Sequence, residues 1–116
     1  MRRTRTFSLL LFIILLLFGC SGAPTITVYN GSSMTISNIS LKGNGFAETI
    51  ESIKPGSSVS ITVHPKGESD LAIIFDTPEG KKGKNDLAYF EASGGYKINI
   101  EINERFEITA KGTIGA

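Results

Sequence analysis

From residue 25 onwards, apolar and polar residues alternate along most of the chain. In the clearest run, 96–102, one Tyr and three Ile residues alternate with Lys, Asn and Glu, and the segments 25–29 and 58–64 follow the same pattern. A period of two residues places successive side chains on opposite faces of a β-strand. No segment after residue 24 keeps the spacing of an amphipathic helix, so the pattern predicts an all-β domain.

Two segments depart from simple alternation. Met34 to Ile36 alternates, but Ile39 and Leu41 continue on the opposite parity, which predicts a β-bulge near Ser37-Asn38. Residues 71–75 are apolar without interruption, which predicts a strand covered on both faces.

Clusters of Gly, Pro, Asn and Ser separate the apolar runs and predict turns. They fall at 30–31, 43–45, 54–57, 65–67 and 93–95. Further strands are predicted at 46–53, 87–91 and 106–110, whereas residues 77–85 are predicted to form a polar loop or a hairpin tip.

Seven or eight short strands at a spacing of about ten residues are typical of a small antiparallel β-sandwich with Ig-like architecture. The sandwich is predicted to span residues 25–116. The chain has no Trp and only one Cys, so the Ig-type core of Trp and disulfide is absent and the prediction concerns architecture alone. A small β-barrel is the alternative.

The first eighteen residues have a different composition. Arg2, Arg3 and Arg5 form a basic segment without acids, and residues 7–18 are apolar except for Ser8. As a helix this run would extend about 18 Å, which is shorter than the hydrocarbon core of about 30 Å. Its length therefore favours the apolar region of a cleaved N-terminal signal helix over a membrane span.

The segment Leu17-Phe18-Gly19-Cys20 resembles the lipobox of bacterial lipoproteins. The resemblance implies cleavage between Gly19 and Cys20, a diacylglycerol on the Cys20 sulfur, and an acyl chain on the new α-amino group. Phe18 is bulkier than the residue usual in that family, which predicts slower processing. An uncleaved signal anchor and a cleaved signal without lipid remain the alternatives.

The resemblance divides the chain into a signal peptide (1–19), a lipidated cysteine with a short tether (20–24) and the β-domain (25–116). Four extended residues after Cys20 reach about 14 Å, so the domain is expected to lie against the bilayer. In Gram-negative members of the family, Ser at the position of Ser21 permits sorting to the outer membrane. The periplasmic face of the outer membrane is therefore the expected location, ahead of the inner membrane.

Charge excludes one class of partner. Three of the 12 Lys and Arg residues precede Cys20, whereas all 11 acids follow it, so the mature chain has a net charge near −2. This balance does not predict nucleic-acid binding. A single cysteine excludes an intramolecular disulfide, and lipid attachment accounts for an unpaired thiol in an exported protein.

Catalytic and metal-binding patterns are weak. His64 is the only histidine and is interpreted as a surface residue, and no serine lies in a Gly-x-Ser-x-Gly context. The chain cannot supply a typical zinc site. Two pairs of acids in predicted loops, Glu68 with Asp70 and Asp76 with Glu79, are the type of ligand that Ca²⁺ takes, with solvated turn acids as the competing interpretation.

The densest basic cluster is Lys81, Lys82 and Lys84. It is a candidate surface contact for anionic lipid, lipopolysaccharide phosphate or a partner, and the competing interpretation is a solvated loop that discourages sheet-edge pairing. We expect this loop at the end of the sandwich remote from the membrane. The aromatic residues Tyr89, Phe90 and Tyr96 are interpreted as core and cross-strand packing.

These features predict a non-catalytic binding module of the cell envelope, anchored by lipid and contacting an envelope protein, with no cofactor besides the lipid on Cys20. A superinfection-exclusion lipoprotein of prophage type is the alternative, because such proteins share the small size, the lipobox and the lack of catalytic residues. A metal-binding protein or an enzyme is a third, weaker hypothesis.

Overall fold

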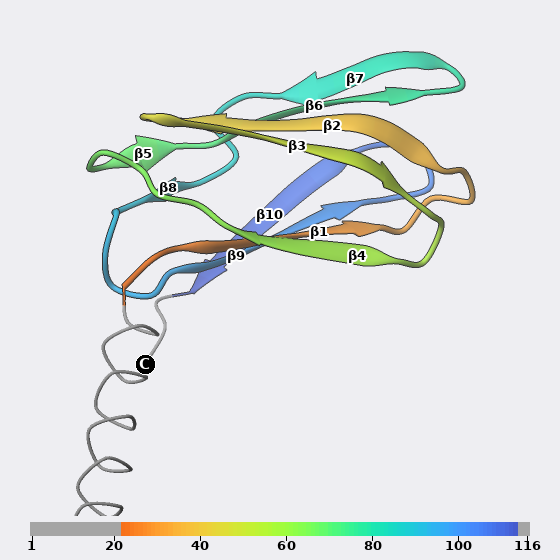
Figure 1. Ribbon diagram of the computed structural model, residues 1–116. Coiled ribbons are helices and arrows are strands. Elements are labelled where there is room, and N and C mark those ends of the chain that lie inside the picture. The colour runs from red at the N-terminus through yellow and green to blue at the C-terminus, as the bar shows by residue number, and fades with distance from the viewer. Residues whose placement is uncertain (1–21, 114–116) are drawn as a thin grey trace, which may run out of the picture.

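The computed structural model describes residues 22–113, which form two four-stranded sheets packed face to face (Figure 1). Sheet A has the strand order β10-β9-β1-β4, and sheet B has the order β3-β2-β6-β7. A short ribbon of β5 and β8 lies at one end. The strands are β1 (Thr25–Asn30), β2 (Ile36–Gly43), β3 (Phe46–Ile53), β4 (Ser58–Thr62), β5 (Ser69–Asp70), β6 (Ala72–Thr77), β7 (Gly80–Lys84), β8 (Tyr89–Phe90), β9 (Lys97–Ile102) and β10 (Ile108–Thr113).

The prediction of an all-β sandwich is confirmed. The two sheets together contain eight strands, the upper number predicted, and β5 and β8 are additional strands of two residues each. Between residues 22 and 113 the sheets stay separate, so the alternative of a small closed barrel is wrong. The same residues contain no helix long and apolar enough to cross a bilayer.

One strand pair of the antiparallel sandwich is parallel, which the sequence pattern did not predict. β1 lies between β4, to which it is antiparallel, and β9, to which it is parallel. The parallel ladder runs from the pair Thr25 and Lys97 to the pair Asn30 and Ile102. Alternation along a strand shows which side chains face the core but not the direction of its neighbour, because the side-chain period is the same in both kinds of ladder.

The core lies between the two sheets and is built from their inward rows. Sheet A contributes Ile26, Val28, Ile98, Ile100, Ile102 and Ile108, and sheet B contributes Ile36, Ile39, Leu41, Ile50, Ile53, Ile73 and Phe75. Val63, Leu71, Phe90 and Phe106 extend this core outside those rows. Burial of these apolar side chains is the main stabilising contribution to the fold.

The predicted bulge in β2 is confirmed. The register between β2 and β6 shifts by one residue between Ser37 and Ser40, and Asn38 has a φ of 49°. Ile36 and Ile39 are three residues apart and both are fully buried. The extra residue thus returns the apolar side chains of β2 to the core, as the change of parity predicted.

The predicted turn at 54–57 is also confirmed. Ser57 donates its backbone N–H to the Lys54 carbonyl at 3.1 Å, and Gly56 has a φ of 75°. Pro55 at the second position and a glycine at positive φ at the third are the residues that a type II turn requires. This turn joins sheet B to sheet A, because β3 precedes it and β4 follows it.

Three segment predictions are wrong wholly or in part. The run 71–75 is not covered on both faces, since Ile74 points to the outer face of sheet B and is 40% exposed. Residues 77–85 include the tip of a hairpin, between Thr77 and Gly80, as one of the two alternatives predicted, but residues 80–84 are a strand, β7. The predicted strand 87–91 is reduced to the two residues of β8.

Candidate functional site

Gly19 and Cys20, the predicted cleavage and lipidation residues, lie outside the described part of the chain. The residues that follow are held on the sandwich: the Gly22 carbonyl accepts a hydrogen bond from the Gly95 N–H at 3.2 Å, and the Pro24 carbonyl accepts one from Val63 at 3.0 Å. Pro24 is buried. Gly22 and Pro24, which belong to the predicted tether 20–24, are therefore in contact with the sandwich.

The two ends of the sandwich carry different loops. The β2–β3 turn and the segments before β5 and β9 lie at the end where β1 begins, and the turns β3–β4, β6–β7 and β9–β10 lie at the opposite end (Figure 1). His64 lies in the segment before β5 and is exposed, as predicted. The β6–β7 turn lies at the remote end, but β7 then runs back, so its lysines are spread along the edge of sheet B.

Lys81, Lys82 and Lys84 do not form a single patch, because β7 turns them to two faces. Lys81 is paired with Asp76 in the register of β6 and β7 and lies on the outer face. Lys82 and Lys84 are opposite Phe75 and Ile73, whose side chains face the core. Both lysines thus point to the core side at the open edge, and Lys84 Nζ donates to the Ile108 carbonyl of β10 at 3.3 Å.

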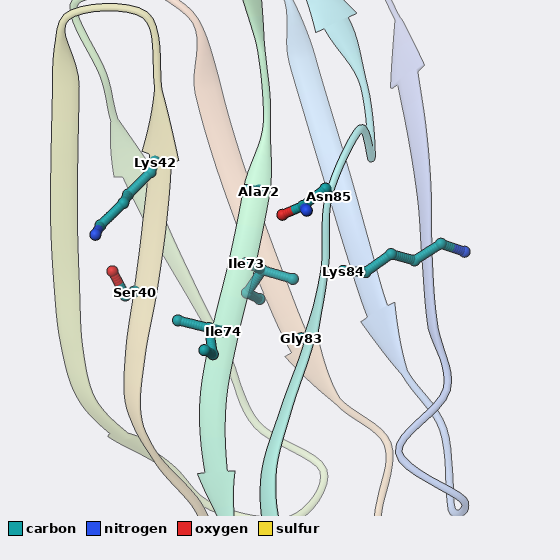
Figure 2. A pocket seen from close by; sticks show the side chains of 8 residues that line it. All are labelled: Ser40, Lys42, Ala72, Ile73, Ile74, Gly83, Lys84 and Asn85. Atoms are coloured by element: carbon teal, nitrogen blue, oxygen red, sulfur yellow. The ribbon is translucent and has the colours of Figure 1, made fainter.

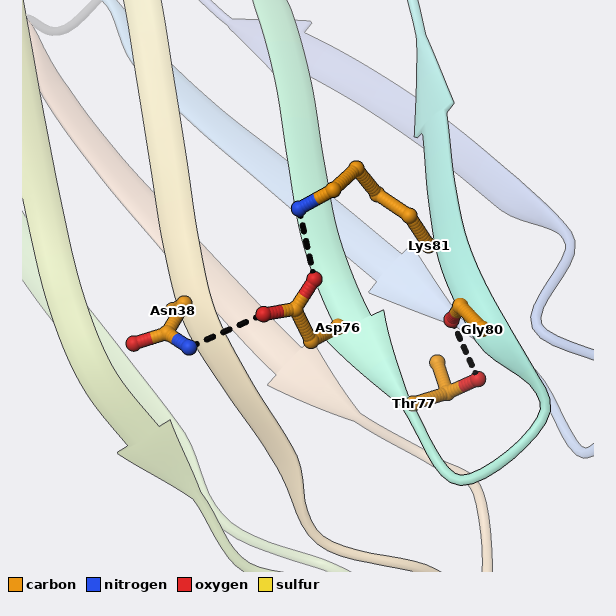
Figure 3. Close-up of polar contacts among 5 residues, drawn as sticks. All are labelled: Asn38, Asp76, Thr77, Gly80 and Lys81. Atoms are coloured by element: carbon orange, nitrogen blue, oxygen red, sulfur yellow. Dashed lines mark hydrogen bonds and ion pairs between the residues drawn. The ribbon is translucent and has the colours of Figure 1, made fainter.

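Asp76 has both carboxylate oxygens occupied (Figure 3). Lys81 Nζ lies 2.7 Å from Oδ1, and the Asn38 amide donates to Oδ2 at 2.9 Å. These hydrogen bonds, that from Lys81 first, hold the pKa of Asp76 below its usual value. The alternative of a calcium site at Asp76 and Glu79 gains no support from these contacts, and no group of three or more His, Cys, Asp or Glu residues in 22–113 is placed to hold a metal ion.

We expect the substitution Lys81→Met to raise the pKa of Asp76 towards 3.8, since it removes the largest cause of the lowered value. A carboxyl whose pKa is lowered in the folded state contributes stability at neutral pH that is lost as the pH falls through that folded value. NMR titration of the Asp76 carboxyl carbon in both proteins measures the change. Lys82→Met, one residue away on the other face, is the control, and equal titration of Asp76 in wild type and Lys81→Met would contradict the assignment.

Glu68 and Asp70, the other pair of acids noted in the sequence, have different surroundings. Tyr89 donates its hydroxyl to Glu68 Oε2 at 2.5 Å, and this hydrogen bond raises the pKa of Tyr89. Asp70 lies in β5, opposite Tyr89 in the register. Tyr89 is 68% exposed, so its assignment to the core is wrong, whereas Phe90 is buried with its ring centroid 6.2 Å from that of Phe46 and 6.5 Å from that of Tyr96.

A hollow that the sequence did not predict lies on the outer face of sheet B, next to β7 (Figure 2). It has a volume of about 390 Å³ and is lined by Ser40, Lys42, Ala72, Ile73, Ile74, Gly83, Lys84 and Asn85. The lining contains no acid, and of its two lysines only Lys42 has its side chain on the outer face, since that of Lys84 points to the core side. The exposed Ile74 is the apolar centre of this surface, which we call the Ile74 hollow.

Glycine at position 83 explains why the Ile74 hollow exists. Gly83 is directly opposite Ile74 in the register of β6 and β7. A Cβ at position 83 would lie 3.3 Å from Ile74 Cγ1 and 2.9 Å from the Ile73 carbonyl oxygen. A side chain there would cover Ile74 and crowd β6, so the glycine leaves an apolar residue open beside the edge of the sheet.

A second hollow of about 360 Å³ lies at the remote end, next to sheet A. Its lining is Tyr29, Gly31, Glu101, Ile102, Asn103, Glu104, Glu107 and Thr109. The Asn103 side chain is used within the β9–β10 turn, where its Oδ1 accepts from the backbone N–H groups of Arg105 and Glu107. The three glutamates make this second hollow acidic, in contrast to the Ile74 hollow.

Comparison with known proteins supports the fold but does not indicate a family or a function. No protein-family model matches the chain, and no curated protein does. The chain is similar to a protein from Eubacterium rectale whose structure was determined by NMR, with a TM-score of 0.57, 18% identity, and coverage of 81% of this chain and 91% of the other. At this identity the similarity shows a shared fold.

Proposed function

We propose that the chain is a membrane-anchored bacterial lipoprotein whose small β-sandwich is a non-catalytic binding module of the cell envelope. The observation that carries the proposal is the junction between the two parts of the chain. The lipobox-like segment ends at Cys20, and Gly22, two residues later, is already hydrogen-bonded to the sandwich. A lipid on Cys20 would therefore hold the β1 end of the domain at the headgroups and present its remote end and sheet edges to the periplasm.

The described surface also supports a binding role. The large apolar side chains that are exposed in the described residues include Ile74 in a hollow of sheet B, Tyr29 beside the second hollow, and Met34 in the β1–β2 loop. The titratable side chains with shifted pKa values, Asp76 and Tyr89, are held by surface hydrogen bonds. Such contacts are those of surface ion pairs and turns rather than of a general acid or base poised in a cleft.

The substitution Cys20→Ser is expected to move the protein out of the washed membrane fraction or leave it as an unprocessed precursor. Two or three acyl chains hold a domain on a bilayer durably, whereas the polar remainder of the chain does not. Fractionation of a Gram-negative host with alkaline and high-salt washes measures the change. Mature Cys20→Ser that resists both washes would contradict lipid anchoring.

Ser21→Asp is the matched control, because it keeps the cysteine and should stay membrane-bound while moving from the outer to the inner membrane.

The binding role is examined in the same cells with a photo-crosslinking residue at Thr27, on the outer face of sheet A, or at Ile74. Adducts of defined mass that are lost with Cys20→Ser are expected. Adducts from neither face would contradict a binding module.

A further inference from the structure

The edge of sheet B at β7 has the features of a strand-addition site. In the described chain β7 pairs with β6 alone, so its other side has no strand to pair with. An unpaired edge can accept an extended segment of another protein through main-chain hydrogen bonds, and the side chains on the two faces then decide which segment fits.

We propose that β7 binds an extended segment of a partner protein in which two acidic residues flank a large apolar or aromatic residue, and this site rests on the binding role proposed above. The chemistry follows from the register of β6 and β7. On the core side of the edge, Lys82 and Lys84 lie two residues apart. Residues directly opposite them on an added strand would be acidic, because opposite charges in directly opposed positions stabilise a strand pair.

The middle residue of the added segment would lie on the outer face of the sheet, opposite Gly83. Gly83 lies between the two lysines on this outer face and has no side chain. A large residue opposite Gly83 on an added strand can lie across the glycine, into the Ile74 hollow, and contact the exposed Ile74. Aromatic residues that cover an edge glycine in this way stabilise strand pairing. Figure 2 shows Gly83 on β7 beside β6, and the Ile74 side chain on the side of β6 that faces Ser40 of β2.

Charge decides between the possible occupants of this edge. A second copy of the chain would place the β7 lysines against one another, and like charges directly opposite are destabilising. Lys81 does not add to this repulsion, since Asp76 lies 2.7 Å from its Nζ. Lys82 and Lys84 carry the positive charge of this edge, and Lys42 in the Ile74 hollow adds to it. This charge favours an acidic segment as the occupant.

The probe is the capped peptide TVEFEVT, whose sequence reads the same in both directions and so pairs in either orientation. Added to the ¹⁵N-labelled full chain in detergent micelles, it should shift the backbone amide signals of β7 and of Ile74. TVKFKVT should bind about tenfold more weakly, because it opposes two lysines to the lysines of β7. TVEGEVT, which lacks the aromatic ring, should also bind more weakly.

The variant Lys82→Glu should weaken TVEFEVT and strengthen TVKFKVT, an exchange of preference that loss of structure would not produce. Lys82→Gln, which removes the charge without reversing it, should change both affinities in the same directions as Lys82→Glu but by less. Lys97→Glu, the same charge change on the outer face of sheet A, is the matched control and should change neither. The proposal is overturned if TVEFEVT shifts no β7 signal, if both charged peptides bind equally, or if the chain instead pairs with itself through β7. None of these results would alter the membrane fractionation of Cys20→Ser, so failure of this site is distinguishable from failure of the anchored lipoprotein.

Discussion

The substitution Ile100→Asp is expected to unfold the sandwich at room temperature or to leave it barely folded. Ile100 is fully buried in β9, between Val28 of β1 and Ala110 of β10. A carboxyl group at this position would have no partner in the apolar core, at a cost of about 4 kcal/mol or more. Domains of this size are stable by about 5–15 kcal/mol, so one such change removes much of the total.

Asn99→Asp is the matched control for this prediction. Asn99 precedes Ile100 but is exposed on the outer face of sheet A, opposite Lys111 of β10. The new carboxylate would stay in water beside a lysine, so the free energy of unfolding should change by less than about 0.5 kcal/mol. Urea denaturation followed by circular dichroism measures both variants. Equal midpoints for Ile100→Asp and wild type would contradict the placement of β9 at the centre of the core.

The second large effect is expected at Asn30, a fully buried polar residue at the end of β1. Its side-chain amide donates to the carbonyls of Met34 and Ile53 at 2.8 and 2.9 Å. Its Oδ1 accepts from the backbone N–H and the hydroxyl of Ser32 at 3.0 and 2.7 Å. One side chain therefore satisfies the backbone of the β1–β2 loop and the end of β3.

Asn30→Ala should lower the free energy of unfolding by about 3 kcal/mol, because it leaves several buried donors and acceptors without partners. Asn30→Asp should also destabilise strongly, since a carboxylate cannot donate to the two carbonyls and would repel them. Asn44→Ala is the control: the Asn44 side chain is exposed and donates to the Glu68 carbonyl at 3.1 Å. A cost at Asn30 no larger than that at Asn44 would contradict the buried network.

Asn30 also shows where local sequence patterns stop being informative. Asn30 followed by Gly31 predicts a turn, and the chain does leave β1 there. The role of the side chain, however, depends on Ile53, which is 23 residues away and belongs to the other sheet. A short-range pattern identifies the turn but carries no information about the distant carbonyl that the amide satisfies.

The same distinction explains the rest of the fold. The buried and exposed faces of the strands could be predicted because apolar and polar residues alternate along each strand. The bulge in β2 could be predicted from the change of parity between Ile36 and Ile39. The parallel pairing of β1 with β9 was not, because it depends on which strands meet across the chain. β7 was missed for a different reason: two glycines and three lysines have low intrinsic strand preference, and pairing with β6 overrides it.

The candidate site divides in a similar way. The lysines of β7 were identified from their density in the sequence, but their separation onto two faces follows from the register with β6. The Ile74 hollow forms because an exposed isoleucine and a glycine, nine positions apart in the sequence, are opposite each other in the register of β6 and β7. The sequence alone does not give this register. An uninterrupted apolar run is ambiguous between a strand buried on both sides and one with a single exposed apolar side chain.

The intact mass of the wild-type protein, isolated from the membrane fraction of a Gram-negative host, shows whether the chain is a lipoprotein. We expect the mass of residues 20–116 with a diacylglycerol and an additional acyl chain on Cys20. A membrane-bound chain with the mass of residues 1–116 and no lipid would instead indicate an uncleaved signal anchor. A shorter chain without lipid would indicate an ordinary exported protein, and either of these two results would contradict the lipoprotein account.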